Sequence, residues 1–228
     1  MLKLNYFNGK GMGETSRLIM VAAGTKFEDY RYPIKIKDWG TYDIEREEFN
    51  QDKAAGKLWK SMGKVPFLNV GKGIISQSKA IERYLATRFK MMGDTLEESA
   101  LIDSYCEYIR DYKTAYQAVK RKENKEEALN EWFDNTLSEK LIVFDKLIFE
   151  NMDFQNMVTP SSERRFAVGH KLSLADLVIY SFLVDFFDNK EAVDTACNNC
   201  MILKNIVKNV SENQKIKEWV ENQEPTPF

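Results

Sequence analysis

The sequence predicts two folded parts, an α/β part at the N-terminus followed by an all-helical part. Short β-prone runs alternate with helical patterns in the first ninety or so residues, whereas only helical spacing of apolar residues is found from about residue 95 onward. A short linker at about 90–95 separates the two patterns. We therefore expect one domain over 1–89 and a second, all-helical domain over 95–228.

The first part opens with a βαβ pattern. Residues 2–7 alternate apolar and polar side chains as a strand does, and the Gly-rich turn 8–13 follows them. A helix is expected over about 14–23, because Leu, Ile and Ala recur on one face and Gly24 is placed to stop it. A second strand is expected at 27–32. This unit would form the start of a mixed sheet.

A ββα pattern completes the first part. Pro66 lies second in a β-prone run, where its missing N–H cannot serve a central ladder, so it marks a strand start or bend. The backbone of Val65 is then available to pair with an extended peptide. After the turn 71–73, Gln77 and Ser78 open a helix whose free N–H groups suit a carboxylate. The combined order, βαβ followed by ββα, is that of a thioredoxin-like domain.

The segment 63–85, GKVPFLNVGKGIISQSKAIERYL, resembles the glutathione-binding half of cytosolic glutathione transferases, closest to the sigma class. Taken alone it could equally be an ordinary hairpin with a Ser78 N-cap. The resemblance nevertheless covers nearly the whole chain, with a second signature at 169–176 and a matching final helix and tail. It implies an N-terminal thioredoxin-like domain (βαβαββα), a C-terminal helical domain, glutathione as co-substrate and a homodimer.

Tyr6 matches the tyrosine that hydrogen-bonds the glutathione sulfur in sigma-type transferases. A free thiol is only a few per cent thiolate at pH 7, and the thiolate is the nucleophile. A donor O–H aimed at the sulfur favours the charged form, so Tyr6 would act as a protonated hydrogen-bond donor. Without the resemblance, an aromatic side chain packing on the core is the more common role of a strand tyrosine.

The resemblance implies further roles where residues match. Trp39 and Lys60 would hold the glycine end of glutathione, Gln77 and Ser78 the γ-glutamyl carboxylate, and Asp111 the γ-glutamyl ammonium of the other subunit. The full set of expected glutathione-binding residues is Phe7, Trp39, Lys60, Lys64, Val65, Pro66, Gln77, Ser78 and Asp111. The second-substrate pocket would be bordered by Met12, Tyr112 and Tyr116 and would accept an apolar electrophile.

Two residues depart from the sigma-class pattern, and one segment is unusually long. Met12 replaces an arginine that often lies near the thiolate, and Ala118 replaces a tryptophan of the prostaglandin-isomerising members. The segment 40–63 is longer than expected for the family. Two alternatives therefore stay open: a non-catalytic ligand-binding or crystallin-like protein on the same fold, and a glutathione-dependent lipid isomerase or peroxidase.

Composition narrows the classes of partner. The net charge of −2 comes from 33 basic and 35 acidic residues, so no global field attracts nucleic acid or an anionic membrane. No apolar run is long enough to span a bilayer, and the N-terminus lacks a signal-peptide core. These features predict a cytoplasmic protein without a nucleic-acid or membrane partner.

Three cysteines argue against a disulfide framework. Cys197 and Cys200 form a CxxC, but His170 is the only histidine and has no paired motif, so no metal site is expected. A thioredoxin-type redox pair would follow the first strand, whereas this pair lies far into the helical part, so a redox role for it is the minor alternative.

Helices dominate the second part. A stripe that includes Tyr112 and Tyr116 lines one face of a long helix over about 101–119, and a second helix is expected over 129–148. Ser173 and Asp176 form a capping pair before the apolar helix 177–187, which should be the buried centre of the domain. His170 is expected to be a loop residue.

Overall fold

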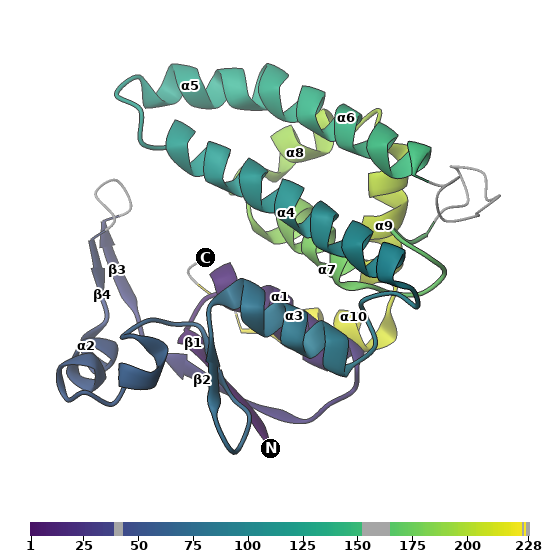
Figure 1. Cartoon of the computed structure of the whole chain (residues 1–228). Helices are drawn as coiled ribbons and strands as arrows, with labels where there is room; N and C mark the ends of the chain where they lie inside the picture. The colour runs from purple at the N-terminus through teal and green to yellow at the C-terminus, as the bar shows by residue number, and fades with distance from the viewer. Residues whose placement is uncertain (39–42, 152–164, 225, 227–228) are drawn as a thin grey trace. The chain divides into compact units, whose positions relative to one another are not determined.

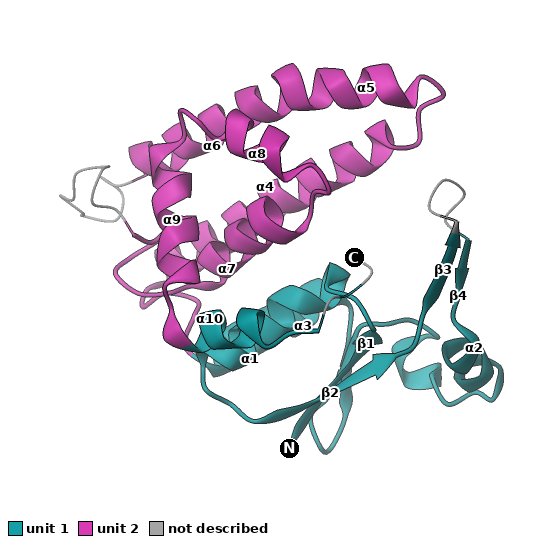
Figure 2. Cartoon of the chain, turned by 180° about the vertical axis from the view of Figure 1, so that it is seen from behind, with its two compact units in different colours: residues 1–89, 215–228 teal, residues 90–214 magenta. Residues whose placement is uncertain are grey.

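The computed structural model describes residues 1–38, 43–151, 165–224 and 226. The chain forms two compact units, Met1–Phe89 with Lys215–Phe228 and Lys90–Gln214 (Figure 2). The last residues thus group with the N-terminal unit, although the sequence pattern placed them in the helical domain. This difference arises from long-range contacts of the final helix, which local periodicity cannot reveal.

Unit 1 is built on a four-stranded mixed sheet (Figure 1). Strand β1 (Leu2–Phe7) pairs in parallel with β2 (Phe27–Tyr32) and antiparallel with β5 (Phe67–Asn69), which pairs antiparallel with β6 (Ile74–Ser76). The sheet order is β2-β1-β5-β6. The predicted βαβ and ββα patterns are confirmed.

Two helices lie side by side against this sheet, α1 (Glu14–Ala22) and α3 (Ser78–Arg88). Gly24 follows α1 with a φ of 66°, as its predicted stop requires. Alternation along β1 buries Leu4 and Tyr6, while Phe7 contacts Phe49 of α2 (Glu47–Ala54) with ring centroids 5.1 Å apart. The sheet therefore buries side chains on both faces.

The long segment between β2 and β5 forms elements of its own. A hairpin of β3 (Lys35–Asp38) and β4 (Asp43–Glu45) precedes α2, and a 3₁₀ turn, Trp59–Ser61, follows α2. Phe49 and Leu58 are anchored in an apolar cluster with Tyr32 and Phe67. A hollow of about 490 Å³ is lined by Pro33, Ile34, Lys35, Glu45, Glu47, Glu48 and Gln51, none of them a predicted site residue.

Unit 2 consists of helices around the buried helix α7 (Leu174–Tyr180). Helix α7 contacts α4 (Leu96–Val119) and α9 (Met201–Ser211), and all its residues are buried, as the sequence predicts. Helices α5 (Lys125–Glu131), α6 (Leu137–Glu150) and α8 (Lys190–Ala196) also belong to this unit. None of the helices in the described ranges is long and apolar enough to cross a membrane.

The capping pair before α7 is confirmed. Asp176 is fully buried and accepts hydrogen bonds from the backbone N–H of Ser173 at 2.7 Å and of Ala167 at 2.6 Å. The Asp176 carboxylate thus accepts from the N-cap residue of α7 and also binds the backbone of the preceding loop at Ala167. His170 is exposed in a turn, as predicted.

Some helix boundaries differ from the sequence pattern. The single helix expected over 129–148 is interrupted by one π-helical turn, Trp132–Thr136, and α7 is followed by another, Ser181–Asp185. The final helical stretch is divided into α9 and α10 (Gln214–Glu221). A π-helical turn adds one residue to a single turn of a helix and leaves the helix apolar. The sequence pattern therefore indicates a helix but does not locate this turn.

Candidate active site

Tyr6 lies at the end of β1 with its ring buried and its hydroxyl oriented by the following turn. The backbone N–H of Met12 donates to Tyr6 Oη at 3.1 Å. A Cβ on Gly13 would lie only 2.8 Å from Tyr6 Cδ1, so this position requires glycine. The hydroxyl oxygen thus accepts a bond from the turn, and its own proton stays available for another acceptor.

Burial raises the pKa of Tyr6, although the Met12 N–H and the Arg17 guanidinium act in the opposite direction. The raised pKa keeps the phenol protonated at neutral pH. Tyr6 is therefore prepared as a hydrogen-bond donor, and not as a general base.

Strand register brings Tyr6, Pro66 and Gln77 into one row. Asn5 of β1 lies opposite Phe67 of β5, which lies opposite Ser76 of β6. Both pairs are antiparallel. Continuing the register by one residue therefore sets Tyr6 opposite Pro66, and Pro66 opposite Gln77. Neighbouring strands are about 4.8 Å apart, so the row, which we call the Tyr6–Pro66–Gln77 row, spans about 10 Å.

The Val65–Pro66 bond in this row is cis. Strand β5 begins only at Phe67, so Val65 lies outside its ladder. In the described parts of the chain, no other backbone group pairs with the N–H or C=O of Val65. The predicted vacancy for an extended peptide beside β5 is consistent with this geometry.

At the end of the row, Gln77 caps α3 with an unusual backbone conformation. Its φ is 73° and its ψ is 118°, a region that residues with a Cβ rarely adopt. Gln77 is exposed and Ser78, the first helical residue, is buried. The Gln77 side chain makes no capping hydrogen bond to the first turn of α3, and the N–H groups of such a helix start suit an anion.

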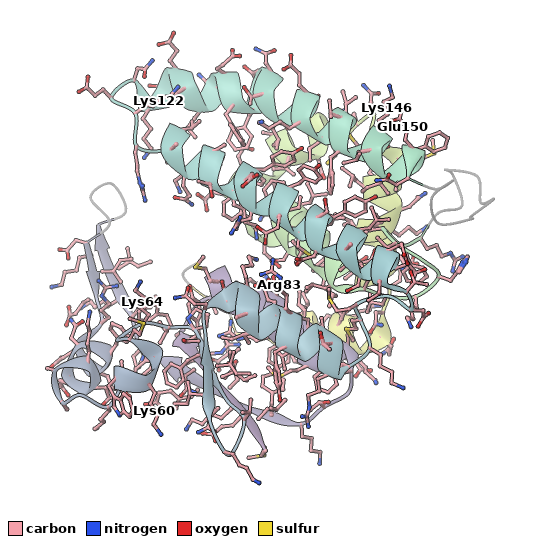
Figure 3. All side chains as sticks on the ribbon, viewed as in Figure 1. Lys60, Lys64, Arg83, Lys122, Lys146 and Glu150 are labelled. Carbon is pink, nitrogen blue, oxygen red and sulfur yellow. The ribbon has the colours of Figure 1, made fainter. Side chains whose placement is uncertain are left out.

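The other predicted residues of unit 1 differ in position. Phe7 is half-buried at the end of β1, while Lys60 and Lys64 are exposed. In Figure 3, Lys64 lies at the upper side of unit 1 and Lys60 at its lower side. Lys60 stacks over the Trp59 ring at 5.6 Å. Trp39 lies outside the described residues.

The predicted residues of unit 2 lie on α4. Asp111 is exposed, whereas Tyr112 is half-buried and its hydroxyl donates to the carbonyl of Lys140 at 3.4 Å. Tyr116 is only 4% exposed and packs among aromatic rings, with the Phe187 centroid at 4.8 Å. Its ring thus belongs to the core of unit 2. Met12, the remaining pocket residue, is 61% exposed in unit 1.

A buried ionic network below Tyr6 was not anticipated from the sequence. Arg17 of α1 is fully buried and bonds Asp29 of β2 at 3.0 Å and Glu14 at 3.1 Å. It also donates to the carbonyl of Gly9 at 2.8 Å, in the turn that leads to Met12. Its guanidinium lies 5.9 Å from the Tyr6 ring centre. Arg17 therefore connects the sheet, the turn and α1.

The C-terminal segment completes this network. Glu14 is 1% exposed and accepts hydrogen bonds from Trp219 Nε1 at 3.3 Å and from Gln223 Nε2 at 2.9 Å. The available sequence signal was the pair of opposite charges three residues apart on the apolar face of α1. Trp219 and Gln223, the partners of Glu14, lie more than 200 residues later, so the local sequence does not indicate them.

No cluster of three or more His, Cys, Asp or Glu side chains is placed to hold a metal ion in the parts of the chain that the structure describes. The arrangement offers instead a phenol donor, an unpaired backbone segment and an uncapped helix start. Together they suit a thiol-containing peptide with a carboxylate.

Comparisons with known proteins identify the family of the chain. A family model for the glutathione S-transferase C-terminal domain matches residues 110–223. Glutathione S-transferase 3 of Caenorhabditis elegans is 30% identical over 99% of this chain and 98% of its own. The fold is also that of solved glutathione S-transferases, a thioredoxin-like domain followed by a helical one.

Two solved structures illustrate the similarity. A glutathione S-transferase from Ascaris lumbricoides has 27% identity, covers 100% of both chains and gives a TM-score of 0.76. A monomeric glutathione S-transferase from the hookworm Necator americanus has 25% identity, covers 100% of this chain and 99% of its own, and gives a TM-score of 0.77. The chain belongs to the glutathione S-transferase family.

Proposed function

We propose that this protein conjugates glutathione to apolar electrophiles and that Tyr6 stabilises the glutathione thiolate. The observation that carries the proposal is the Tyr6–Pro66–Gln77 row. Continued from the strand register, the backbone of this row spans about 10 Å, the scale of an extended tripeptide at about 3.3 Å per residue. Its residues offer a protonated phenol, the unpaired backbone beside Pro66 and the start of α3. The Tyr6 hydroxyl would donate to the sulfur and favour its ionised form.

The tripeptide backbone would pair with Val65 as an added strand, which leaves the cysteinyl sulfur directed at Tyr6. Gln77, Ser78 and the first N–H groups of α3 would hold the γ-glutamyl carboxylate. Trp39 and Lys60 would hold the glycine end, and the backbone of the segment 64–66 would pair with the cysteinyl unit. Residues 1–89 would thus form the glutathione-binding domain.

The electrophile would be held by residues of the second domain, 95–228, with Met12 of the first. Tyr112 is better suited to this task than Tyr116, because its side chain is partly exposed whereas Tyr116 is buried. In a sigma-like homodimer, Asp111 would reach the γ-glutamyl ammonium of the other subunit. A monomer, as described for the hookworm relative, would leave Asp111 without this role.

The proposal is tested by conjugation of glutathione to chlorodinitrobenzene, followed by absorbance, beside calorimetric binding of glutathione to the same preparation. We expect both binding and turnover. Binding without turnover, across a panel that includes aryl halides, unsaturated carbonyls and lipid hydroperoxides, would contradict the catalytic proposal and support a ligand-binding protein. Turnover limited to a lipid substrate would instead indicate the isomerase or peroxidase alternative.

Replacing Gln77 by glycine should separate ligand binding from stability. Glycine adopts a φ of 73° without strain, so the free energy of unfolding should stay within about 1 kcal/mol of the wild type or rise. Loss of the amide should weaken glutathione binding by about tenfold, the effect of one hydrogen bond to a charged group. Denaturant unfolding and calorimetry measure the two effects.

Lys90→Gly is the matched control for this variant. Lys90 also has a positive φ, 58°, and is exposed, but it is no predicted glutathione contact. Its replacement should leave glutathione affinity unchanged. Equal affinity of Gln77→Gly and the wild type would remove Gln77 from the proposed binding site.

A further inference from the structure

Two buried thiols, Cys197 and Cys200, meet at the junction of two helices in unit 2. Cys197 follows the last residue of α8, and Cys200 is the N-cap of α9. They are 5% and 0% exposed, respectively, and neither is in a disulfide. The proposed conjugation assigns no role to either thiol.

The backbone already brings the pair to disulfide distance. The N–H of Cys200 donates to the carbonyl of Cys197 at 2.9 Å and closes a four-residue turn. In such a turn the first and last Cα atoms are within about 7 Å. A disulfide requires Cα atoms about 4.4–6.8 Å apart, so the junction needs little movement to be bridged.

The two thiols influence each other's ionisation. Interaction with Cys200, and then burial, raises the pKa of Cys197, whereas interaction with Cys197 lowers the pKa of Cys200. Lys204, one turn into α9, also lowers the pKa of Cys200, and burial and Asp145 oppose both effects. Cys200 is therefore the member of the pair that more readily becomes a thiolate.

The surroundings allow a small reagent to reach the pair. Asn198 and Asn199, which connect the two cysteines, are both exposed, and α8 has only seven residues. A short helix at the surface opens locally more easily than a central one. Cys106 is buried to a similar degree, at 3% exposed, but it lies within the 24-residue helix α4, which opens less easily.

We propose that Cys197 and Cys200 form a redox-active dithiol that small hydroperoxides oxidise to an intramolecular disulfide. The Cys200 thiolate attacks the peroxide oxygen, the O–O bond breaks, and the leaving hydroxide takes a proton to become water. The Cys197 sulfur then displaces a second water from the Cys200 sulfenic acid. Overall, two thiols and one hydrogen peroxide give one disulfide and two waters.

Glutathione can reverse this oxidation by thiol–disulfide exchange. One glutathione thiolate attacks the protein disulfide to form a mixed disulfide, and a second releases glutathione disulfide and the protein dithiol. This oxidation needs no contribution from Tyr6. Its test is therefore independent of the test of the proposed conjugation.

The test treats the folded full-length protein with hydrogen peroxide, blocks remaining thiols with an alkylating reagent, and analyses tryptic peptides by mass spectrometry. Both cysteines of the pair fall in peptide 191–204, and Cys106 falls in peptide 91–110. We expect 191–204 to lose two hydrogen atoms at least about tenfold faster than Cys106 reacts, because the thiolate is the nucleophile and the junction opens more easily than α4. Sulfoxide formation at Met201 adds an oxygen and is distinguished by mass.

Single variants separate the roles of the two thiols. In Cys197→Ser, Cys200 should still react and accumulate as a sulfenic acid or a glutathione adduct. In Cys200→Ser, Cys197 should stay unmodified; thermal unfolding of each variant checks that the fold is kept. Retention of both thiols in peptide 191–204 while the protein is folded, or oxidation of Cys106 at the same rate, would overturn the proposal.

Discussion

Replacing Tyr6 by phenylalanine is expected to lower kcat/KM for conjugation by about 10²–10³-fold, the usual cost of removing one donor aimed at a reacting anion. The substitution removes a hydroxyl and keeps a ring that is 7% exposed, so packing should change little. Because burial raises the pKa of Tyr6, the phenol is protonated at the pH of the assay and acts as a donor. Glutathione affinity at low pH, where the thiol is neutral, should persist.

The pKa of the bound thiol gives the more specific readout. Loss of the donor should raise that pKa, so the rising limb of the pH–rate profile should move to higher pH in Tyr6→Phe. Ultraviolet absorbance of the bound thiolate, measured as pH is varied, reports the same shift without turnover. A structural role of Tyr6 alone would reduce the amount of folded protein but would not move the profile.

Tyr84→Phe provides a matched control. Tyr84 lies on α3 of the same unit, and its hydroxyl accepts a long, 3.4 Å hydrogen bond from the exposed Arg88. This variant should retain the wild-type rate and profile. If Tyr6→Phe behaves like Tyr84→Phe, the thiolate role of Tyr6 is wrong, although membership of the family is unaffected.

Local pattern accounts for much of the fold. The bounds of β1, α1 and β2 follow from alternation, helical spacing and the stop at Gly24, and the start of α7 follows from Ser173 and Asp176. Each of these signals is contained within a few residues. The π-helical turns and the break between α9 and α10 carry no such signal, so the sequence predicted longer helices there.

The site was predictable only in part. Tyr6, Pro66 and Gln77 could be named from the sequence and the resemblance, but their common row depends on strand register. Arg17 could not be assigned, because its partners come from a turn, a strand and, through Glu14, the last helix. Interactions between distant segments decide which charged residues are buried.

Replacing Arg17 by methionine is expected to lower the free energy of unfolding by about 3–5 kcal/mol, because Glu14 and Asp29 then lose the buried cation that they share. Glu14 is 1% exposed, and Asp29 has 14% of its side chain exposed. The turn carbonyl of Gly9 would also lose its donor. Urea unfolding, followed by circular dichroism, measures the loss.

Two further variants identify the physical origin of that loss. Arg17→Lys keeps the charge but cannot reproduce the fork that reaches Asp29, Glu14 and Gly9 together, so it should recover only part of the stability. Arg31→Met also removes a 2.7 Å partner of Asp29, but the Arg31 side chain is 22% exposed, and the expected cost is below about 1 kcal/mol. If Arg17→Met costs no more than Arg31→Met, the buried network does not stabilise the fold. A large cost for Arg17→Met alone would mean that the buried Arg17 side chain stabilises the turn that orients Tyr6, without being a proposed substrate contact.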